Sequence, residues 1–389
     1  MPVWHILLLS AALQLPTTEI ETLKGERATG ELVELNDSSA VLKQGTQSVS
    51  FPLPGLLAVR FPQAPPAEPS LGSRLSLVDG SRLTCSSFSV TGDKARCQTA
   101  FGNLTLTVSR LSSVRFGVST PKLDENWNAL LTRESTTDLL VVKKEDVLDF
   151  LAGVTGDVGE KINLLLDGEV VPVTRDKAYG IVYHRRLPTL PKSICQIQLT
   201  SGDVLETTQL TWEAGKARAK LVAGPEVEVP QGQIAALDFS VSKIKYLSDL
   251  KPRDTKYVPF FDVIGILDEY RRDRSLDGTP ITLKGRSYPR GIALHSKTML
   301  RFRIAGEYSR FQATAGIDDT VAESGHCVQL LITGDGKPLF DGEIKGREAP
   351  RPLDLDVSGV RDLEITVDFG SDNSDIGDHL DLADAKLVK

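Results

Sequence analysis

The side chains best suited to chemistry lie toward the end of this 389-residue chain, in three short pairs. The pairs are His295 with Ser296, Asp318 with Asp319, and Asp378 with His379. Imidazole and carboxyl groups can act as general acids and bases, and they can also hydrogen-bond the vicinal hydroxyls of a sugar. The sequence contains no H-E-x-x-H, no G-x-S-x-G and no phosphate-binding glycine loop, so the common hydrolase and nucleotide motifs are absent.

A loop-like segment, residues 370–381, is rich in carboxylates. They occur at Asp372, Asp375, Asp378 and Asp381, separated by small polar residues. Hard oxygen ligands of this kind suit Ca²⁺, although the spacing is not that of an EF-hand. The segment therefore has two readings: a calcium site built from Asp372, Asp375 and Asp378, or a solvated acidic loop before the last strand.

Short strands must position these pairs. Apolar and polar residues alternate with period 2 over residues 292–294 and 299–304, and residues 328–332 form an apolar run. The segment between the first two runs, around His295 and Ser296, is turn-prone. Asp335 and Gly336 form the dipeptide that favours a primed hairpin turn. Loops at one end of such a sheet are where binding groups commonly gather.

In combination, these motifs resemble the NPCBM carbohydrate-binding family, a galactose-binding-like β-sandwich (jelly roll). The resemblance covers residues 244–389, with a variable insertion near 251–279. It includes the run 283–319, late strands at 357–360 and 363–369, and a closing segment, 378–383, that reads Asp-His-Leu-Asp-Leu-Ala. The closing segment is similar to the family's Asp-His-x-Asp-Trp-Ala signature, but Leu382 stands where the family usually has Trp.

The resemblance implies that this region binds a glycan without catalysing a reaction, since such modules usually bind rather than react. The residues it places at the carbohydrate are His295, Ser296, Asp318, Asp319, Asp378 and His379. Each has an ordinary alternative role, because Asp and Ser close turns and a loop His often satisfies a carbonyl. The region has no Trp to stack on a sugar ring. The rival interpretation is a structural or protein-interaction component that has no sugar binding.

The first half of the chain carries a fourfold internal repeat. Each copy ends in an apolar-x-x-apolar-x-aromatic signature, and the four closing aromatics are Phe61, Phe116, Tyr183 and Phe239. Each copy opens with an apolar residue and a polar turn about 40 positions earlier, a regularity typical of repeat architectures.

Short β-rich runs between Gly, Asp and Asn turns predict a meander of about five strands per copy. The layout resembles small SH3-like or Sm-like barrels, in which a 3₁₀ turn precedes the last strand. We expect four barrels over residues 20–62, 73–118, 138–186 and 194–242, with a short helix within 120–137. Units this small have little core of their own, so we expect neighbouring barrels to pair, and the barrels could also bind protein partners. The fold class expected for the whole chain is all-β.

Composition and the N-terminus point to an exported protein. The hydrophobic fraction is 40%, the charged fraction is 25% and the net charge is −7, which disfavours nucleic acid as a partner. The apolar run 6–15 is too short to span a bilayer, and within residues 1–16 it is typical of a signal-peptide core, the alternative being a first strand. We therefore expect no membrane span, and a secreted, periplasmic or cell-surface location.

Four cysteines complete the inventory, and none has zinc-ligand spacing. Cys85 and Cys97 flank a predicted turn, so they could be bridged or could remain two buried thiols. Cys195 and Cys327 are expected to be core residues.

Overall fold

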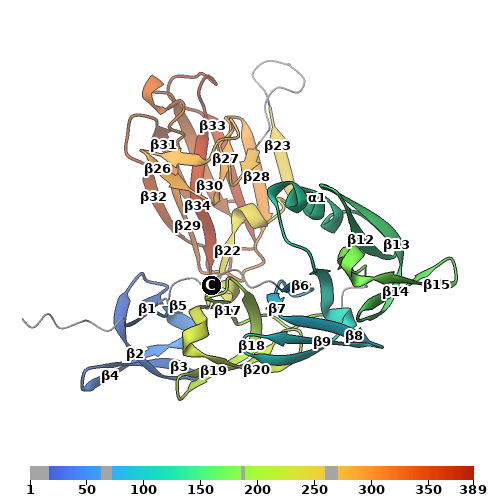
Figure 1. Ribbon diagram of the computed structural model, residues 1–389. Helices are drawn as coiled ribbons and strands as arrows, with labels where there is room; N and C mark the ends of the chain where they lie inside the picture. Colours follow the sequence, from blue (N-terminus) through green and yellow to red (C-terminus); the bar gives the residue numbers. More distant parts are fainter. Residues whose placement is uncertain (1–16, 63–71, 185–188, 259–269) are drawn as a thin grey trace, which may run out of the picture. The chain divides into compact units, whose positions relative to one another are not determined.

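The computed structural model describes residues 17–62, 72–184, 189–258 and 270–389. The chain divides into two compact units, Met1–Ser242 and Lys243–Lys389 (Figure 1). Strands dominate both units, so the all-β class expected from the sequence is confirmed. The expected signal peptide, residues 1–16, lies outside the described residues. No described helix is long and apolar enough to cross a membrane.

The first unit contains four copies of an antiparallel meander. Copy 1 consists of β1 (Thr18–Thr22), β2 (Arg27–Leu35), β3 (Ser39–Gln44), β4 (Gln47–Pro52) and β5 (Leu56–Arg60). Copy 2 consists of β6 (Ser73–Leu77), β7 (Arg82–Cys85), β8 (Ser87–Thr91), β9 (Lys94–Thr99), β10 (Gly102–Thr107) and β11 (Leu111–Arg115). Copy 3 consists of β12 (Asp138–Lys144), β13 (Val147–Val158), β14 (Lys161–Leu166), β15 (Glu169–Thr174) and β16 (Ala178–Val182). Copy 4 consists of β17 (Cys195–Leu199), β18 (Val204–Glu213), β19 (Lys216–Leu221), β20 (Glu226–Pro230) and β21 (Ile234–Asp238).

A 3₁₀ turn precedes the last strand of every copy, as the sequence predicts. The four turns are η1 (Leu53–Gly55), η2 (Val108–Arg110), η3 (Arg175–Lys177) and η4 (Gln231–Gln233). After the turn, the last strand pairs with the first strand of its own copy: β5 with β1, β11 with β6, β16 with β12 and β21 with β17. This pairing closes each meander on itself, which leaves few unpaired edges.

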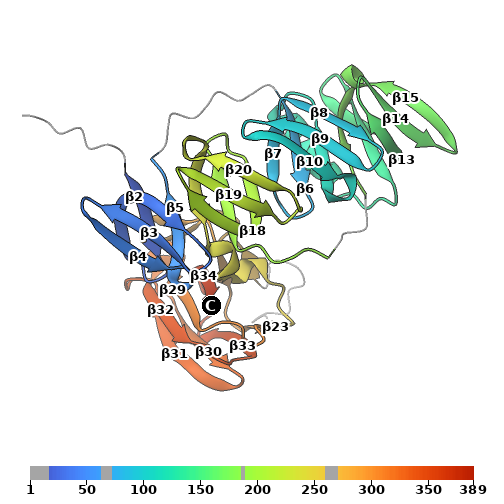
Figure 2. The same ribbon diagram turned by 90° about the horizontal axis from the view of Figure 1, so that it is seen from below.

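The copies are also joined in pairs through their last strands. Figure 2 shows copy 1 beside copy 4 and copy 2 beside copy 3. β5 pairs antiparallel with β21, where Val59 lies opposite Leu237. β11 pairs antiparallel with β16, where Val114 lies opposite Ile181. In both pairs the matched residues stand two positions before the closing aromatic, so copies 1 and 4 meet in the same register as copies 2 and 3.

Three of the closing aromatics are buried: Phe61, Tyr183 and Phe239. Phe61 stacks on Trp212 with ring centroids 5.0 Å apart. Phe116 is only partly buried; it lies 6.2 Å from the Phe88 ring, and the Arg175 guanidinium covers its face at 4.4 Å. The four closing aromatics therefore occupy equivalent positions after their strands, but their side chains are not equally buried.

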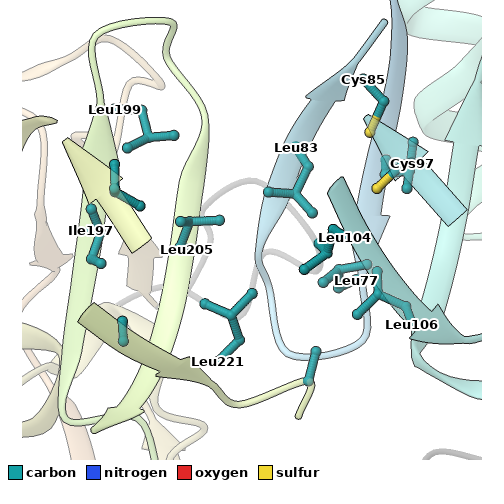
Figure 3. Close-up of a cluster of buried hydrophobic side chains, with 14 of the residues drawn as sticks. Leu77, Leu83, Cys85, Cys97, Leu104, Leu106, Ile197, Leu199, Leu205 and Leu221 are labelled. Atoms are coloured by element: carbon teal, nitrogen blue, oxygen red, sulfur yellow. The ribbon is translucent and has the colours of Figure 1, made fainter. Parts of the chain in front are cut away.

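The cysteines of the first unit are core residues. Figure 3 shows the Cys85 and Cys97 side chains close together among Leu77, Leu104 and Leu106. Both are buried free thiols in this structure, as is Cys195, and so is Cys327 in the second unit. Of the two alternatives for Cys85 and Cys97, the structure therefore has two buried thiols and no disulfide bridge.

One helix, α1 (Pro121–Leu131), follows copy 2, as predicted for residues 120–137. The Thr120 side chain accepts a hydrogen bond from the Leu123 amide, and Pro121 stands at the first helical turn, which favours a helix start here. Leu123, Trp127 and Leu130 form the buried face of the helix. They pack with residues of copy 3, including Tyr179, whose ring lies 5.8 Å from Trp127.

The second unit is a β-sandwich. One sheet contains β24 (Tyr270–Arg272), β27 (Gly291–Leu294), β34 (Leu380–Val388), β29 (Arg310–Ile317) and β32 (Arg351–Asp356), with β22 (Ile244–Tyr246) paired to β34. The other contains β23 (Asp254–Tyr257), β28 (Thr298–Arg303), β33 (Asp362–Phe369), β30 (Cys327–Gly334) and β31 (Lys337–Lys345). Side chains from both sheets form one hydrophobic core.

Two sequence expectations bear on how the sandwich presents its loops. The strands predicted at 292–294, 299–304 and 328–332 correspond to β27, β28 and β30. The Asp335–Gly336 turn between β30 and β31 has both residues at positive φ, 48° and 78°, as a primed hairpin turn requires.

A separate hairpin, β25 (Ile281–Leu283) and β26 (Arg286–Tyr288), supplies a small apolar cluster against Ala383 of β34. This hairpin packs on the face of the β27–β34–β29 sheet that points away from the main core.

Candidate functional site

Two of the predicted pairs meet at one end of the sandwich, where neighbouring strands end and begin. His295 and Ser296 follow the end of β27, whereas Asp378 and His379 immediately precede β34. The two strands are antiparallel neighbours with Leu294 opposite Leu380, so the end of one lies beside the start of the other. The imidazole centroids of His295 and His379 are consequently 6.2 Å apart.

His295 is almost fully buried. Its Nδ1 lies 3.3 Å from the Ser296 carbonyl oxygen and 3.4 Å from the Ser296 hydroxyl. Tyr257, at the end of β23, meets the imidazole edge-on with ring centroids 6.2 Å apart. Burial lowers the pKa of His295, so the ring is neutral at physiological pH. A neutral imidazole can donate one hydrogen bond and accept another.

Asp378 has no solvent exposure. Burial raises the pKa of its carboxyl to about 7; the nearby Ser296 hydroxyl opposes this rise, and the negative charges of Asp372 and Asp375 add to it. Neither carboxyl oxygen has a hydrogen-bond partner of ordinary geometry within the described part of the chain. A buried polar group left in this state is costly, so an incoming hydroxyl would gain most of a hydrogen bond.

His379 adds a second unsatisfied polar atom. Its Nδ1 is buried and makes no hydrogen bond to any described residue. The closest carboxylate oxygen, Oδ2 of Asp277, is 3.6 Å away. The His379 side chain retains 13% of its exposure, so the site is reachable at this position.

Asp318, at the end of β29, forms a carboxyl pair with Asp381 of β34. Burial and the adjacent Asp318 charge raise the pKa of Asp381 well above its usual range. Burial would also raise the pKa of Asp318, but hydrogen bonds from Asp381, Thr320 and Thr282 outweigh it and hold that pKa low. The pair therefore shares one proton, carried by Asp381.

The remaining contacts of Asp318 and Asp319 are to the chain itself. Asp318 accepts hydrogen bonds from the Thr320 hydroxyl at 2.6 Å and the Thr320 amide at 3.0 Å. Asp319 accepts from the Lys284 and Gly285 amides, both at 2.7 Å. Those two residues form the turn between β25 and β26, at φ values of 50° and 74°. Asp318 and Asp319 thus anchor the covering hairpin, which is the ordinary turn-closing role.

The carboxylates of the acidic segment are not gathered around one point in this structure. No three His, Cys, Asp or Glu side chains among the described residues form a group that could hold a metal ion, and Asp372, Asp375 and Asp378 are not brought together as a ligand set. Asp372 instead lies 3.9 Å from Nδ1 of His326, and Gly377 fits against that imidazole where a Cβ atom would lie 2.2 Å from the ring.

Three neighbours of the site were not singled out as ligand contacts from the sequence: Tyr257, Asp277 and Asp381. Asp381 carries a readable signal, since strand alternation places it on the opposite face from Leu380 and Leu382, which belong to the core. Tyr257 and Asp277 come from the variable segment 251–279, where no pattern marks them.

Comparison with known proteins identifies the second unit. Residues 243–388 match the model of the NPCBM/NEW2 domain, and this part of the chain is an NPCBM/NEW2 domain. Leu382, in place of the usual Trp, is fully buried in the sandwich core, so the exchange changes packing.

Among curated proteins, an endo-alpha-N-acetylgalactosaminidase of Renibacterium salmoninarum is 30% identical over 99 residues. The match covers 25% of this chain and only 6% of that enzyme.

Carbohydrate-binding modules are among the solved structures that are similar to this chain. A CBM51 module of a Clostridium perfringens GH95 protein, in complex with methyl-galactose, is 26% identical, with 37% of this chain and 99% of that chain covered and a TM-score of 0.33. The CBM51-2 and INT domains of Clostridium perfringens ZmpB are 25% identical, with 38% and 32% covered and a TM-score of 0.34. Tandem CBM51 modules of a Streptococcus pneumoniae family 98 glycoside hydrolase are 14% identical, with 81% and 87% covered and a TM-score of 0.32.

Proposed function

We propose that the second unit is a non-catalytic carbohydrate-binding module whose ligand sits where β27 ends and β34 begins. The observation that carries the proposal is the cluster of His295, Ser296, Asp378 and His379. It places hydrogen-bonding groups with unsatisfied buried atoms side by side at one edge of the sandwich. The NPCBM/NEW2 match of residues 243–388 supports this assignment.

The chemistry of the cluster suits sugar hydroxyls. A carboxyl with a pKa near 7 can accept or donate, and a neutral imidazole can do both at once, so vicinal hydroxyls find complementary partners. Each hydrogen bond contributes about 0.5–1.5 kcal/mol net. Because residues 243–389 contain no Trp for ring stacking, we expect a Kd in the high micromolar to millimolar range, about −4 to −6 kcal/mol.

The carboxyl geometry favours binding over hydrolysis. Glycosidases hold two carboxyl groups roughly 5–9 Å apart across a cleft, with space for the sugar between them. Asp318 and Asp381 are instead both fully buried, and they lie close enough for the Asp318 charge to raise the pKa of Asp381. We therefore assign no catalytic residue, and we expect the protein to act at the cell surface or outside the cell, in line with the apolar run at residues 6–15.

The test is a glycan array on the full chain, followed by calorimetric titration of the best ligand, with methyl-galactoside as the first probe. His379→Ala and Asp378→Ala should each weaken binding at least tenfold without a marked fall in melting temperature. Glu307→Gln, an exposed carboxylate after β28, is the matched control and should bind normally.

Two results would contradict the proposal. The first is a correctly folded chain that binds no glycan on the array, which would favour the structural or protein-interaction role. The second is that both site variants melt at a much lower temperature, while their folded fraction still binds the glycan.

A further inference from the structure

A groove of about 590 Å³ lies in the first unit, on copy 2. Its floor is the outer face of β11, β6 and β7, and its walls are one side of helix α1 and the turn at residues 201–203. We call it the arginine groove, because Arg74, Arg82 and Arg115 line it. This volume is within the range of about 300–1,000 Å³ that ligand sites occupy. The groove is remote in sequence from the carbohydrate cluster of the second unit.

The floor of this arginine groove is a two-row grid set by strand register. In one row, Arg115 lies opposite Arg74, which lies opposite Thr84. In the adjacent row, Ser113 lies opposite Ser76, which lies opposite Arg82. Because side chains two apart on a strand share a face, three guanidinium groups and three hydroxyls gather on one surface.

The carboxylates that line the groove are already engaged. Asp124 of α1 is bound by Arg115, with Nη1 and Oδ1 2.5 Å apart, and by the Ser119 hydroxyl. Asp203 accepts hydrogen bonds from the Thr84 amide at 2.9 Å and the Thr84 hydroxyl at 2.8 Å.

Two of the guanidinium groups have donors to spare. Arg74 and Arg82 are exposed, and neither makes a hydrogen bond or ion pair with any residue the structure describes; the charge of Arg74 does act on Asp124, whose pKa it lowers. A chain of net charge −7 thus presents two accessible guanidinium groups in a concave surface beside hydroxyl groups.

We propose that the arginine groove binds an acidic saccharide, with Arg74 and Arg82 holding its carboxylate. A guanidinium offers a planar pair of N–H donors that matches a carboxylate, and two such groups on neighbouring strands can bracket one anionic group. Ser76 and Asn128 lie beside them and can meet the ring hydroxyls. The polar floor suits a sugar acid better than a hydrophobic ligand. This inference does not depend on sugar binding by the second unit.

The test uses the full chain and oligogalacturonate as the probe, with a neutral oligosaccharide of equal length as the ligand control. Binding is measured by calorimetry at low and moderate salt. We expect saturable binding of the acidic probe only, weakened several-fold as salt rises, because the contact is ionic.

The variants separate the groove from general surface charge. Arg74→Gln with Arg82→Gln should weaken binding of the acidic probe at least tenfold at an unchanged melting temperature. Arg96→Gln removes an exposed arginine of β9 in the same copy that does not line the groove, so it should bind as the parent does. His379→Ala, which disables the second-unit site, should also leave this binding intact.

Four outcomes would overturn the proposal. The first three are no saturable binding of the acidic probe, equal loss with Arg96→Gln, and loss with His379→Ala alone, which would assign the acidic sugar to the second unit. Inorganic sulfate competing as well as the oligosaccharide would also overturn it, because the groove would then be a simple anion site.

Discussion

At the residue scale, the carbohydrate cluster depends on a carboxyl that is buried but not permanently charged. The pKa of Asp378 is about 7, above that of an unfolded aspartate, so folding takes up a proton between about pH 4 and pH 7. This contribution favours folding at low pH and is lost as the pH rises through 7.

Asp378→Asn should therefore flatten the pH dependence of stability. The amide is neutral at all pH values, so the variant should be more stable than the parent at pH 8, on the order of 2 kcal/mol, and similar to it at pH 5. Melting temperatures between pH 5 and pH 8 check this. Parallel profiles for parent and variant would mean that Asp378 does not titrate in this range.

The Asp318–Asp381 pair makes a second residue-scale prediction, because its members have opposite protonation states. Asp381→Asn supplies an N–H donor where the protonated carboxyl stood, so it should cost less than about 1 kcal/mol. Asp318→Asn replaces one of the two accepting oxygens by an N–H donor and removes the negative charge, and should cost about 2–3 kcal/mol. Urea unfolding at pH 7 measures both, and equal costs would contradict the assignment of the proton to Asp381.

At the scale of elements, the closing aromatics differ in depth, and stability should follow depth. Phe239 is fully buried, so Phe239→Ala should cost about 3–5 kcal/mol. Phe116 is partly exposed under Arg175, so Phe116→Ala should cost less, about 1–2 kcal/mol. Denaturant unfolding of the two variants provides the comparison. A larger loss at Phe116 would show that the Arg175 contact matters more than burial.

Much of the element plan could be predicted because it is local. Alternation located β27, β28 and β30, turn residues located the 335–336 hairpin turn, and apolar residues at helical spacing located α1. The role of Asp319 could not be predicted, because its partners, the amides of Lys284 and Gly285, are 35 and 34 residues away. For the same reason the sequence grouped Asp318 with His379 as ligand contacts, although the former serves the covering hairpin.

At the scale of the whole molecule, the two units have separate hydrophobic cores. A sandwich of this size can bury enough apolar surface to fold alone. Residues 243–389, produced without the first unit, should therefore show one cooperative thermal transition. A molten, protease-sensitive fragment would contradict the independence of the two units.

The nested pairing of the four copies has a consequence for synthesis. Copies 2 and 3 adjoin in the sequence and can join as soon as both have emerged, whereas β5 of copy 1 must wait for β21, which follows nearly all of the first unit. During that interval β5 presents a free edge, the template on which strands of other chains add. In a chain that is truncated after copy 3, this edge of β5 would stay unpaired. Such a truncated product should aggregate even though its three barrels are intact, and light scattering beside the complete first unit would show it. Because copy 4 is the last to be synthesised, its strand β21 is what finally covers the open edge of β5 in copy 1.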